Sequence, residues 1–300
     1  VLEEEPEYHA YWGDLHGQSE ETIGTNTVDD YFTFARDTAA LDFCSHQGND
    51  FQITKRLWTK IRRAVRKYHA PGRFITFLGY EWSANTLAGG DHNVYYLGDE
   101  GQIHRSSHAQ IADKSDLASD RHPLNRLYDD LRGKKAMVVP HIGGRYADLR
   151  YHDHDLEPLI EVYSEWGEFE WFLDEAMERG YKVGFIAGSD DHKGRPGAAN
   201  PGMSTFGVYG GLTCVYAKEL TRETLWEAFF SRRCYATTGQ RILLRFFVDG
   251  HWMGEEFKAD RAPRIEVEVL GTAPIERVDV IRGRTTIFQF PAQMSRMSDV

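Results

Sequence analysis

The sequence contains only three cysteines, Cys44, Cys214 and Cys234, and no two of them form a Cys-x-x-Cys pair. Because their number is odd and their spacings are wide, we expect free thiols rather than a disulfide framework or a cysteine-based zinc site. Free thiols favour a reducing compartment such as the cytoplasm. The chain does not begin with Met, so an N-terminal leader removed by processing stays open.

Long apolar runs are also missing. No stretch could span a bilayer, so we expect no membrane partner, and residues 1–6 lack the basic start and apolar stretch of a signal peptide.

Positive charge is in deficit: 35 Lys and Arg against 46 Asp and Glu give a net charge of −11. This balance disfavours nucleic acid as a partner, and the basic segment around residues 55–67 is interpreted as a solvated helix. The sequence sets no oligomeric state.

Two parts of the chain differ in their pattern of apolar and polar segments. As far as about residue 235, short apolar runs alternate with amphipathic segments, which predicts an α/β domain with parallel strands over residues 1–238. After about residue 240, short alternating strands are separated by turn pairs such as Asp249-Gly250 and Arg282-Gly283. This pattern predicts a small antiparallel β appendage over residues 239–300, which is incomplete as a sandwich.

Side chains that can bind metal ions stand beside the apolar runs, usually just after them. They are His16, Gln18, His46, Glu81, His92, His141, Asp190 and His192. In an α/β barrel the C-terminal ends of the strands meet on one face, so these side chains should converge there. Imidazole and carboxylate groups together suit zinc, manganese or iron. A structural hydrogen bond would explain any one of them, and it is the repetition that predicts a metal site.

Three of these segments resemble a known family. Gly13–Gln18 reads Gly-Asp-Leu-His-Gly-Gln, Asp91–Tyr96 reads Asp-His-Asn-Val-Tyr-Tyr, and Gly188–Gly197 begins Gly-Ser-Asp-Asp-His. They are similar to the DUF3604 branch of the polymerase and histidinol phosphatase (PHP) superfamily. The resemblance implies a distorted (β/α)7 barrel, up to three divalent ions at the strand ends, and hydrolysis of phosphate esters.

The resemblance also implies how the ligands are shared. One ion would use His16, Gln18, Glu81 and Asp190; a second would use Glu81, His92 and His141; a third would use His46, His192 and an acid or His from the loop after the first motif. Gln18 stands where the family usually has His, and Ile23 stands where an Asp is common. An amide is a poorer ligand than imidazole and Ile cannot ligate, so we expect fewer than three tightly held ions.

Three further residues are candidates for catalysis. Arg145 and Arg195 follow the His141 and His192 segments, and their guanidinium groups match phosphate, sulfate or carboxylate, with structural ion pairing as the alternative. Glu165 ends an apolar strand and would act as acid, base or outer-shell partner.

The sequence therefore predicts a metal-dependent hydrolase, a phosphoesterase acting on a small anionic organic ester through a metal-bound hydroxide. Two alternatives stay open. One is a hydrolase or lyase acting on another class of ester. The other is a non-catalytic metal- or ligand-binding module.

Overall fold

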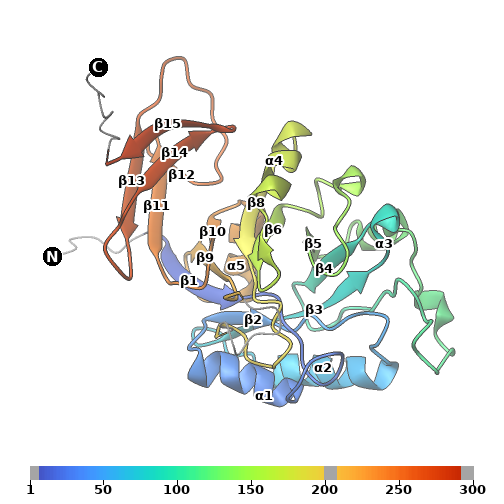
Figure 1. Cartoon of the computed structure of the whole chain (residues 1–300). Helices are drawn as coiled ribbons and strands as arrows, with labels where there is room; N and C mark the ends of the chain where they lie inside the picture. The colour runs from blue at the N-terminus through green and yellow to red at the C-terminus, as the bar shows by residue number, and fades with distance from the viewer. Residues whose placement is uncertain (1–6, 199–207, 292–300) are drawn as a thin grey trace, which may run out of the picture.

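A computed structural model describes residues 7–198 and 208–291 (Figure 1). Its central element is a curled sheet of seven strands in the order β10-β9-β1-β2-β3-β4-β5. The strands are β1 (His9–Asp14), β2 (Phe43–Ser45), β3 (Ile75–Ser83), β4 (Asp91–Tyr96), β5 (Ala136–Pro140), β9 (Leu212–Ala217) and β10 (Cys234–Thr237). Strands β1, β2 and β3 pair in parallel, whereas β4, β5, β9 and β10 join the sheet through antiparallel pairings.

A second sheet of three strands continues the curve. Its order is β7-β6-β8, with β6 (Leu159–Ser164) parallel to β8 (Gly184–Ala187) and antiparallel to the short β7 (Gly167–Glu168). Strand β6 lies beside β5, and β8 lies beside β10. The fold is thus a mixed α/β arrangement around a half-barrel sheet. The distorted (β/α)7 barrel implied by the resemblance is not confirmed, because antiparallel pairings interrupt the parallel series.

Helices cover the sheet. They are α1 (Val28–Thr33), which runs on as a π-helix over Phe34–Thr38, α2 (Lys55–Tyr68), α3 (Leu124–Leu131), α4 (Glu170–Glu178) and α5 (Arg222–Phe230); short 3₁₀ turns occupy Thr86–Ala88, Leu117–Ser119 and Leu149–Tyr151. Threonine side chains at positions 27, 54 and 221 accept backbone N–H groups and so cap α1, α2 and α5. Among the described residues, no helix has the length and apolarity needed to cross a membrane.

The apolar core lies on both faces of the curled sheet. One cluster joins α1, α2 and α3 to the sheet, and another fills the inside of the curve and reaches α5. Every residue of β3 is buried, as expected for a strand covered on both faces. Strands of this kind hold their terminal side chains firmly, because burial on both faces allows little movement.

The C-terminal strands form two antiparallel units. The first is β11 (Leu243–Val248) with β12 (His251–Trp252) and β13 (Ile265–Leu270), and the second is the hairpin of β14 (Val278–Arg282) and β15 (Thr285–Phe290). The expected turn at Asp249-Gly250 is confirmed, with a positive φ angle of 51° at Asp249, whereas the second turn consists of Gly283, with φ 61°, and Arg284, one residue later than expected. Leu244 and Trp252 pack against Tyr216 and Tyr235 of the main sheet. The predicted boundary at residues 238/239 falls between β10 and β11 and stays a prediction.

Candidate metal centre

Hydrogen bonds to one buried carboxylate bring the first and last predicted motifs together. Asp14, the last residue of β1, is fully buried, and its Oδ1 accepts the N–H groups of His16 at 3.1 Å and Ser189 at 3.0 Å. Its Oδ2 accepts the N–H of Gly197 at 2.9 Å. The N–H of Asp190 in turn donates to the carbonyl of His16 at 2.9 Å. The ends of β1 and β8 are therefore fixed to each other.

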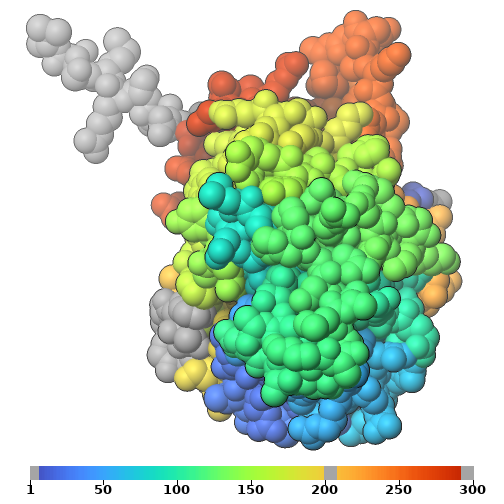
Figure 2. Space-filling view, turned by 90° about the vertical axis from the view of Figure 1, so that its right-hand side faces the viewer, coloured from blue at the N-terminus to red at the C-terminus, as the bar shows by residue number. Residues whose placement is uncertain are grey.

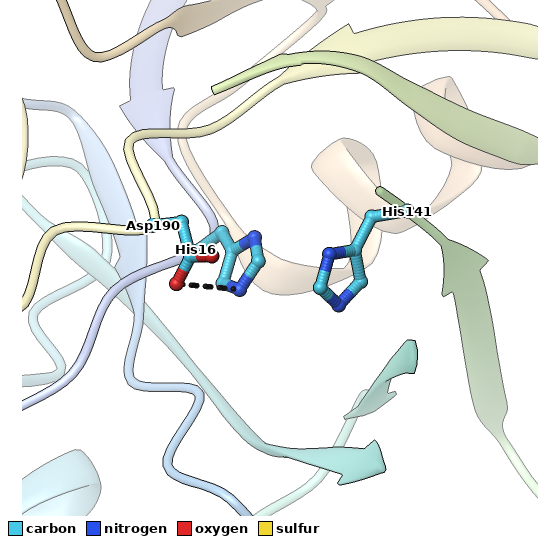
Figure 3. Close-up of side chains that lie close together, drawn as sticks. All are labelled: His16, His141 and Asp190. Carbon is cyan, nitrogen blue, oxygen red and sulfur yellow. Dashed lines mark ion pairs between the residues drawn. The ribbon is translucent and has the colours of Figure 1, made fainter. Parts of the chain in front are cut away.

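Three buried side chains meet at this junction: His16, His141 and Asp190 (Figure 3). The His16 Nε2 atom lies 3.2 Å from Asp190 Oδ1, and the rings of His16 and His141 are 4.4 Å apart at an angle of 75°. Their potential ligand atoms lie within 4.8 Å of one another. His141 follows β5 directly, while His16 and Asp190 follow β1 and β8, so three strand ends supply the group.

Several polar atoms in this group lack hydrogen-bond partners. Among residues 7–198 and 208–291, no partner is found for His16 Nε2, both ring nitrogens of His141, or Asp190 Oδ1. Unpaired buried polar atoms cost free energy, about 1–3 kcal/mol each, and native proteins rarely leave them together. Two imidazoles and a carboxylate form a donor set that suits a divalent transition metal. The residues present therefore fit an ion.

Glu161 contacts the ring nitrogen of His16 that faces away from the group. Its carboxylate oxygens lie 3.0 and 3.2 Å from His16 Nδ1, which leaves Nε2 pointing into the group. A carboxylate on the far nitrogen of a ligating imidazole fixes the ring and raises its basicity. Burial lowers the pKa of His16, but the carboxylates of Asp190 and Glu161 outweigh burial and raise it well above its usual value.

Glu81 and Asp91 form a second group with His141. The Glu81 Oε1 atom lies 3.8 Å from His141 Nε2, and its Oε2 lies 3.9 Å from His16 Nε2. Arg145 already engages this group, because its Nε donates to Asp91 Oδ1 at 2.7 Å and its Nη2 lies 3.9 Å from Glu81 Oε1. Burial first, and then the Glu81 charge, raise the pKa of Asp91 to about 7 despite Arg145.

Gln18 donates a hydrogen bond to Glu81, a member of the second group. Its Nε2 donates to Glu81 Oε2 at 3.2 Å, and its Oε1 accepts the hydroxyl of Thr22 at 2.8 Å. Ser83 donates to the other oxygen of Glu81 at 2.8 Å. The carboxylate of Glu81 is therefore held in place from both sides.

Besides Gln18, three predicted ligands lie outside the two groups. His46 contacts Ser19, whose hydroxyl lies 2.8 Å from its Nε2, beside a Glu21 that is paired with Lys60. His92 lies on the other face of β4, where its Nε2 is 3.5 Å from Glu157. His192 borders the first group, with its Nδ1 2.7 Å from the carbonyl of Asp190.

The remaining candidates lie at the edge of the site. Glu165 is buried directly after β6, and its N–H donates to the carbonyl of Ser189 at 2.9 Å. The next residue, Trp166, donates its indole N–H to Asp190 Oδ2 at 2.6 Å. Arg195 is half-buried, and its backbone N–H donates to the carboxylate of Asp191. Their catalytic roles stay predictions.

Sequence reasoning missed Asp91 and Glu161. Asp91 precedes His92, and because side chains alternate along a strand only one of the two can face the site. Glu161 stands inside an otherwise apolar strand, Leu159–Ser164. A lone acid in such a run was the available signal, because a buried carboxylate requires a partner.

Comparison with known proteins identifies the family. The model of a protein family of unknown function, DUF3604, matches residues 8–146 and 200–273, which is more than half of the chain. The chain belongs to the DUF3604 family. An uncharacterized protein of Chlamydia pneumoniae is 25% identical over 312 residues, which cover 93% of this chain and 48% of that protein. This DUF3604 chain thus spans about half the length of that curated relative.

One solved structure shares the fold, and a second is more distantly similar. A two-domain protein of Bacteroides vulgatus that contains a predicted PHP-like metal-dependent phosphoesterase superposes with a TM-score of 0.55 at 13% identity, over 91% of this chain and 90% of that one. Endonuclease Q in complex with a 27-mer duplex bearing an abasic lesion gives a TM-score of 0.46 at 11% identity, over 74% and 56%.

The endonuclease Q complex corrects one expectation. A similar structure holds duplex DNA, so the exclusion of nucleic acid as a partner of this DUF3604 chain is withdrawn. The exclusion rested on net charge, which averages over the whole surface, whereas recognition depends on the local field at a site. At this TM-score the likeness assigns no substrate to the chain.

Close packing around Gly188 gives a first prediction. A Cβ atom at Gly188 would lie 2.6 Å from His16 Cβ and 2.8 Å from Glu161 Oε2, so Gly188→Ala should displace both side chains. We expect the free energy of unfolding to fall by about 1–3 kcal/mol, measured by chemical denaturation. Gly144→Ala is the matched control, because a Cβ there meets nothing within 4 Å. Equal stabilities of the two variants would contradict the packing argument.

The protonation of the first group gives a second prediction. The pair of His16 and Asp190 has raised pKa values in the metal-free protein: burial is the largest cause for Asp190, and neighbouring carboxylates are the cause for His16. An ion must displace a proton from this pair, so metal affinity should rise with pH through neutrality, with release of about one proton per ion. Calorimetry in buffers of different ionisation enthalpy measures this release. An affinity independent of pH between 6 and 8 would count against it.

Proposed function

We propose that this chain is a metal-dependent hydrolase of phosphate esters. The observation that supports this best is the convergence of His16, His141 and Asp190, whose buried ligand atoms lack hydrogen-bond partners among the described residues. No hydrogen bond accounts for the ring nitrogens of His141, while His16 Nε2 and Asp190 Oδ1 form an ion pair with each other at 3.2 Å; a bound cation would satisfy all of these atoms. The likeness of the fold to a protein containing a predicted PHP-like phosphoesterase agrees with this function.

His16, His141 and Asp190 would hold the tighter ion, with Glu81 beside them. A divalent ion bound there would acidify water and neutralise charge on phosphoryl oxygens. Glu161 keeps the Nε2 atom of His16 directed at the centre. The indole of Trp166 holds Asp190 through its other oxygen, so both ligands are oriented before an ion arrives.

A second ion would bind more weakly. Glu81, Asp91 and His141 form the second group, but Asp91 accepts two hydrogen bonds from Arg145, one from its backbone N–H and one from its side chain. The guanidinium group already supplies positive charge at that position. We therefore expect one stoichiometric ion after dialysis, which narrows the expectation from the sequence of fewer than three. Zinc, manganese and iron all suit the donor set.

Arg145 would also bind the substrate. Its guanidinium lies over the ring of Phe51, 5.6 Å from the ring centre, and is half-buried beside Glu81. A guanidinium group fixed in this way can donate to phosphoryl oxygens and stabilise the charge that develops on them. Glu165, buried beside the Asp190 segment, is the candidate for proton transfer.

Two alternatives remain in view. The same ligands would serve a hydrolase or lyase acting on another ester, because the metal does not set the substrate. A module that binds metal or ligand without catalysis would need the same buried donors. Turnover separates these options: metal-free and metal-loaded protein should be assayed against phosphomonoesters, phosphodiesters including oligonucleotides, and sulfate esters. Lack of metal-dependent turnover of every phosphate ester would overturn the proposed function.

Variants of two histidines give a third prediction. His141→Ala removes a residue shared by both groups, so the tightly held ion should be lost and kcat should fall at least about 100-fold. His92→Ala is the matched control, because His92 faces Glu157 on the other side of β4. It should retain the ion and most of the activity. Metal analysis after dialysis, together with kinetics, measures both effects, and loss of the ion from the His92 variant would place His92 in the site after all.

A further inference from the structure

A small cavity adjoins the metal centre. It has a volume of about 250 Å³, and Arg145 and Ser83 form part of its wall. Both residues also contact Glu81, through a distance of 3.9 Å from Arg145 Nη2 and a hydrogen bond of 2.8 Å from the Ser83 hydroxyl. Each of these two side chains therefore lies between the cavity and the carboxylate of Glu81, which is close to both groups of ligands.

The wall of the cavity is rich in neutral hydrogen-bonding groups. It comprises Phe51, Ser83, Ala84, Asn85, Ser106, Ser107, Ala109, Gln110, His122 and Arg145. Half of these residues carry a hydroxyl or amide group, and among the described residues that line the cavity Arg145 is the single Lys or Arg and none is a carboxylate. Such a lining can donate to and accept from hydroxyl groups, and it offers one cation close to the metal centre.

The segment that follows β4 supplies much of this wall, and it is rigidly held. In Figure 2 this green segment covers much of the face of the molecule turned to the viewer. Arg105 is fully buried: it donates to the carbonyl of Ile53 at 3.0 and 2.8 Å, to Asp116 at 2.7 Å and to Ser119 at 2.6 Å. A buried guanidinium with all these partners fixes the backbone around it.

Asp50 joins the two sides of the cavity. This buried carboxylate accepts the N–H of Ser83 at 2.7 Å with one oxygen and the N–H of Ser106 with the other. Its own N–H donates to the carbonyl of Glu81 at 2.8 Å. Strand β3, which carries Glu81, and the segment after β4 are therefore positioned by the same residue, so the cavity has a fixed place relative to the metal centre.

We infer that this cavity binds the hydroxyl-bearing, sugar-like part of a phosphate ester whose phosphoryl group lies at the metal centre. The inference rests on the proposed function and adds the substrate class to it. A volume of about 250 Å³ is below the usual range of ligand pockets, roughly 300–1,000 Å³, so the group is compact. A free sugar or polyol phosphate and the pentose of a nucleotide share this chemistry.

The test uses variants that change the cavity and leave the metal ligands in place. Asn85 and Gln110 are exposed, and Asn85→Ala combined with Gln110→Ala removes two amide groups from the wall. Ala109→Phe fills the cavity. Asn125→Ala and Ala112→Phe are the matched controls, because both residues are exposed and lie outside the cavity. Substrates are glucose 6-phosphate, ribose 5-phosphate, glycerol 3-phosphate and deoxyadenosine 5′-monophosphate, with p-nitrophenyl phosphate as the reference that lacks hydroxyl groups.

For the best of the hydroxylated substrates, both cavity variants should lower kcat/KM about tenfold or more, because hydrogen bonds to the hydroxyl groups are lost or blocked. The fold decrease in kcat/KM should be about five times or more the decrease seen with p-nitrophenyl phosphate. The control variants should have the same kcat/KM values as the parent protein. Preference for the deoxynucleotide would identify a nucleotide pentose as the group bound. Equal losses for all substrates, or a parent protein that prefers p-nitrophenyl phosphate, would overturn the inference.

Calorimetric titration of the metal-loaded protein with the same phosphates separates this inference from the proposed function. If no ester is hydrolysed but a sugar phosphate binds, and the cavity variants weaken that binding while the controls do not, the cavity is confirmed and the hydrolase is not. If esters are hydrolysed but the cavity variants do not change affinity, the hydrolase stands and the cavity assignment fails.

Discussion

The carboxylate of Asp14 is the constraint on which the site depends. It lies at the end of β1, has no exposure to solvent, and accepts backbone N–H groups from the segments that carry His16 and Asp190. Burial raises its pKa to about 6, although its hydrogen bonds act in the opposite direction. Two parts of the chain separated by about 175 residues are thereby held together with their ligand atoms facing each other. The carboxylate acts together with backbone hydrogen bonds from Asp190 to His16 and from Gln18 to Asp191.

The sequence pointed to residues that converge at the centre of the site, but it did not separate them from His46, His92 and His192, which lie outside the two groups. His16, His141 and Asp190 each stand directly after an apolar run, and the ends of such strands share one edge. Glu81 was equally visible near the end of β3. These predictions hold because they depend only on strand order and polarity, which short apolar runs express clearly.

The choice between Asp91 and His92 could not be made from the sequence. Strand β4 is antiparallel to β3, so its first residues, rather than its last, reach the edge where the ligands meet. Every residue of β4 is buried, and a strand buried on both faces shows no alternation from which its inward side could be read. The distorted (β/α)7 barrel is not confirmed for a related reason, because local patterns predict strands but not whether neighbouring strands run parallel.

The reversed direction of β4 has a consequence for how this architecture can change. Because this direction makes β4 and β5 antiparallel neighbours, with Tyr96 opposite Ala136, a short turn could join them, yet the chain inserts a long connection that includes residues 97–123. That connection contacts Asp50 and forms part of the wall of the cavity. It contributes no residue to either ligand group. Insertions and substitutions in this stretch could reshape what the protein recognises while the donor atoms stay as they are. Under the proposed function, selectivity and metal chemistry would be encoded largely in separate lengths of sequence, so that one can diverge while the other is maintained.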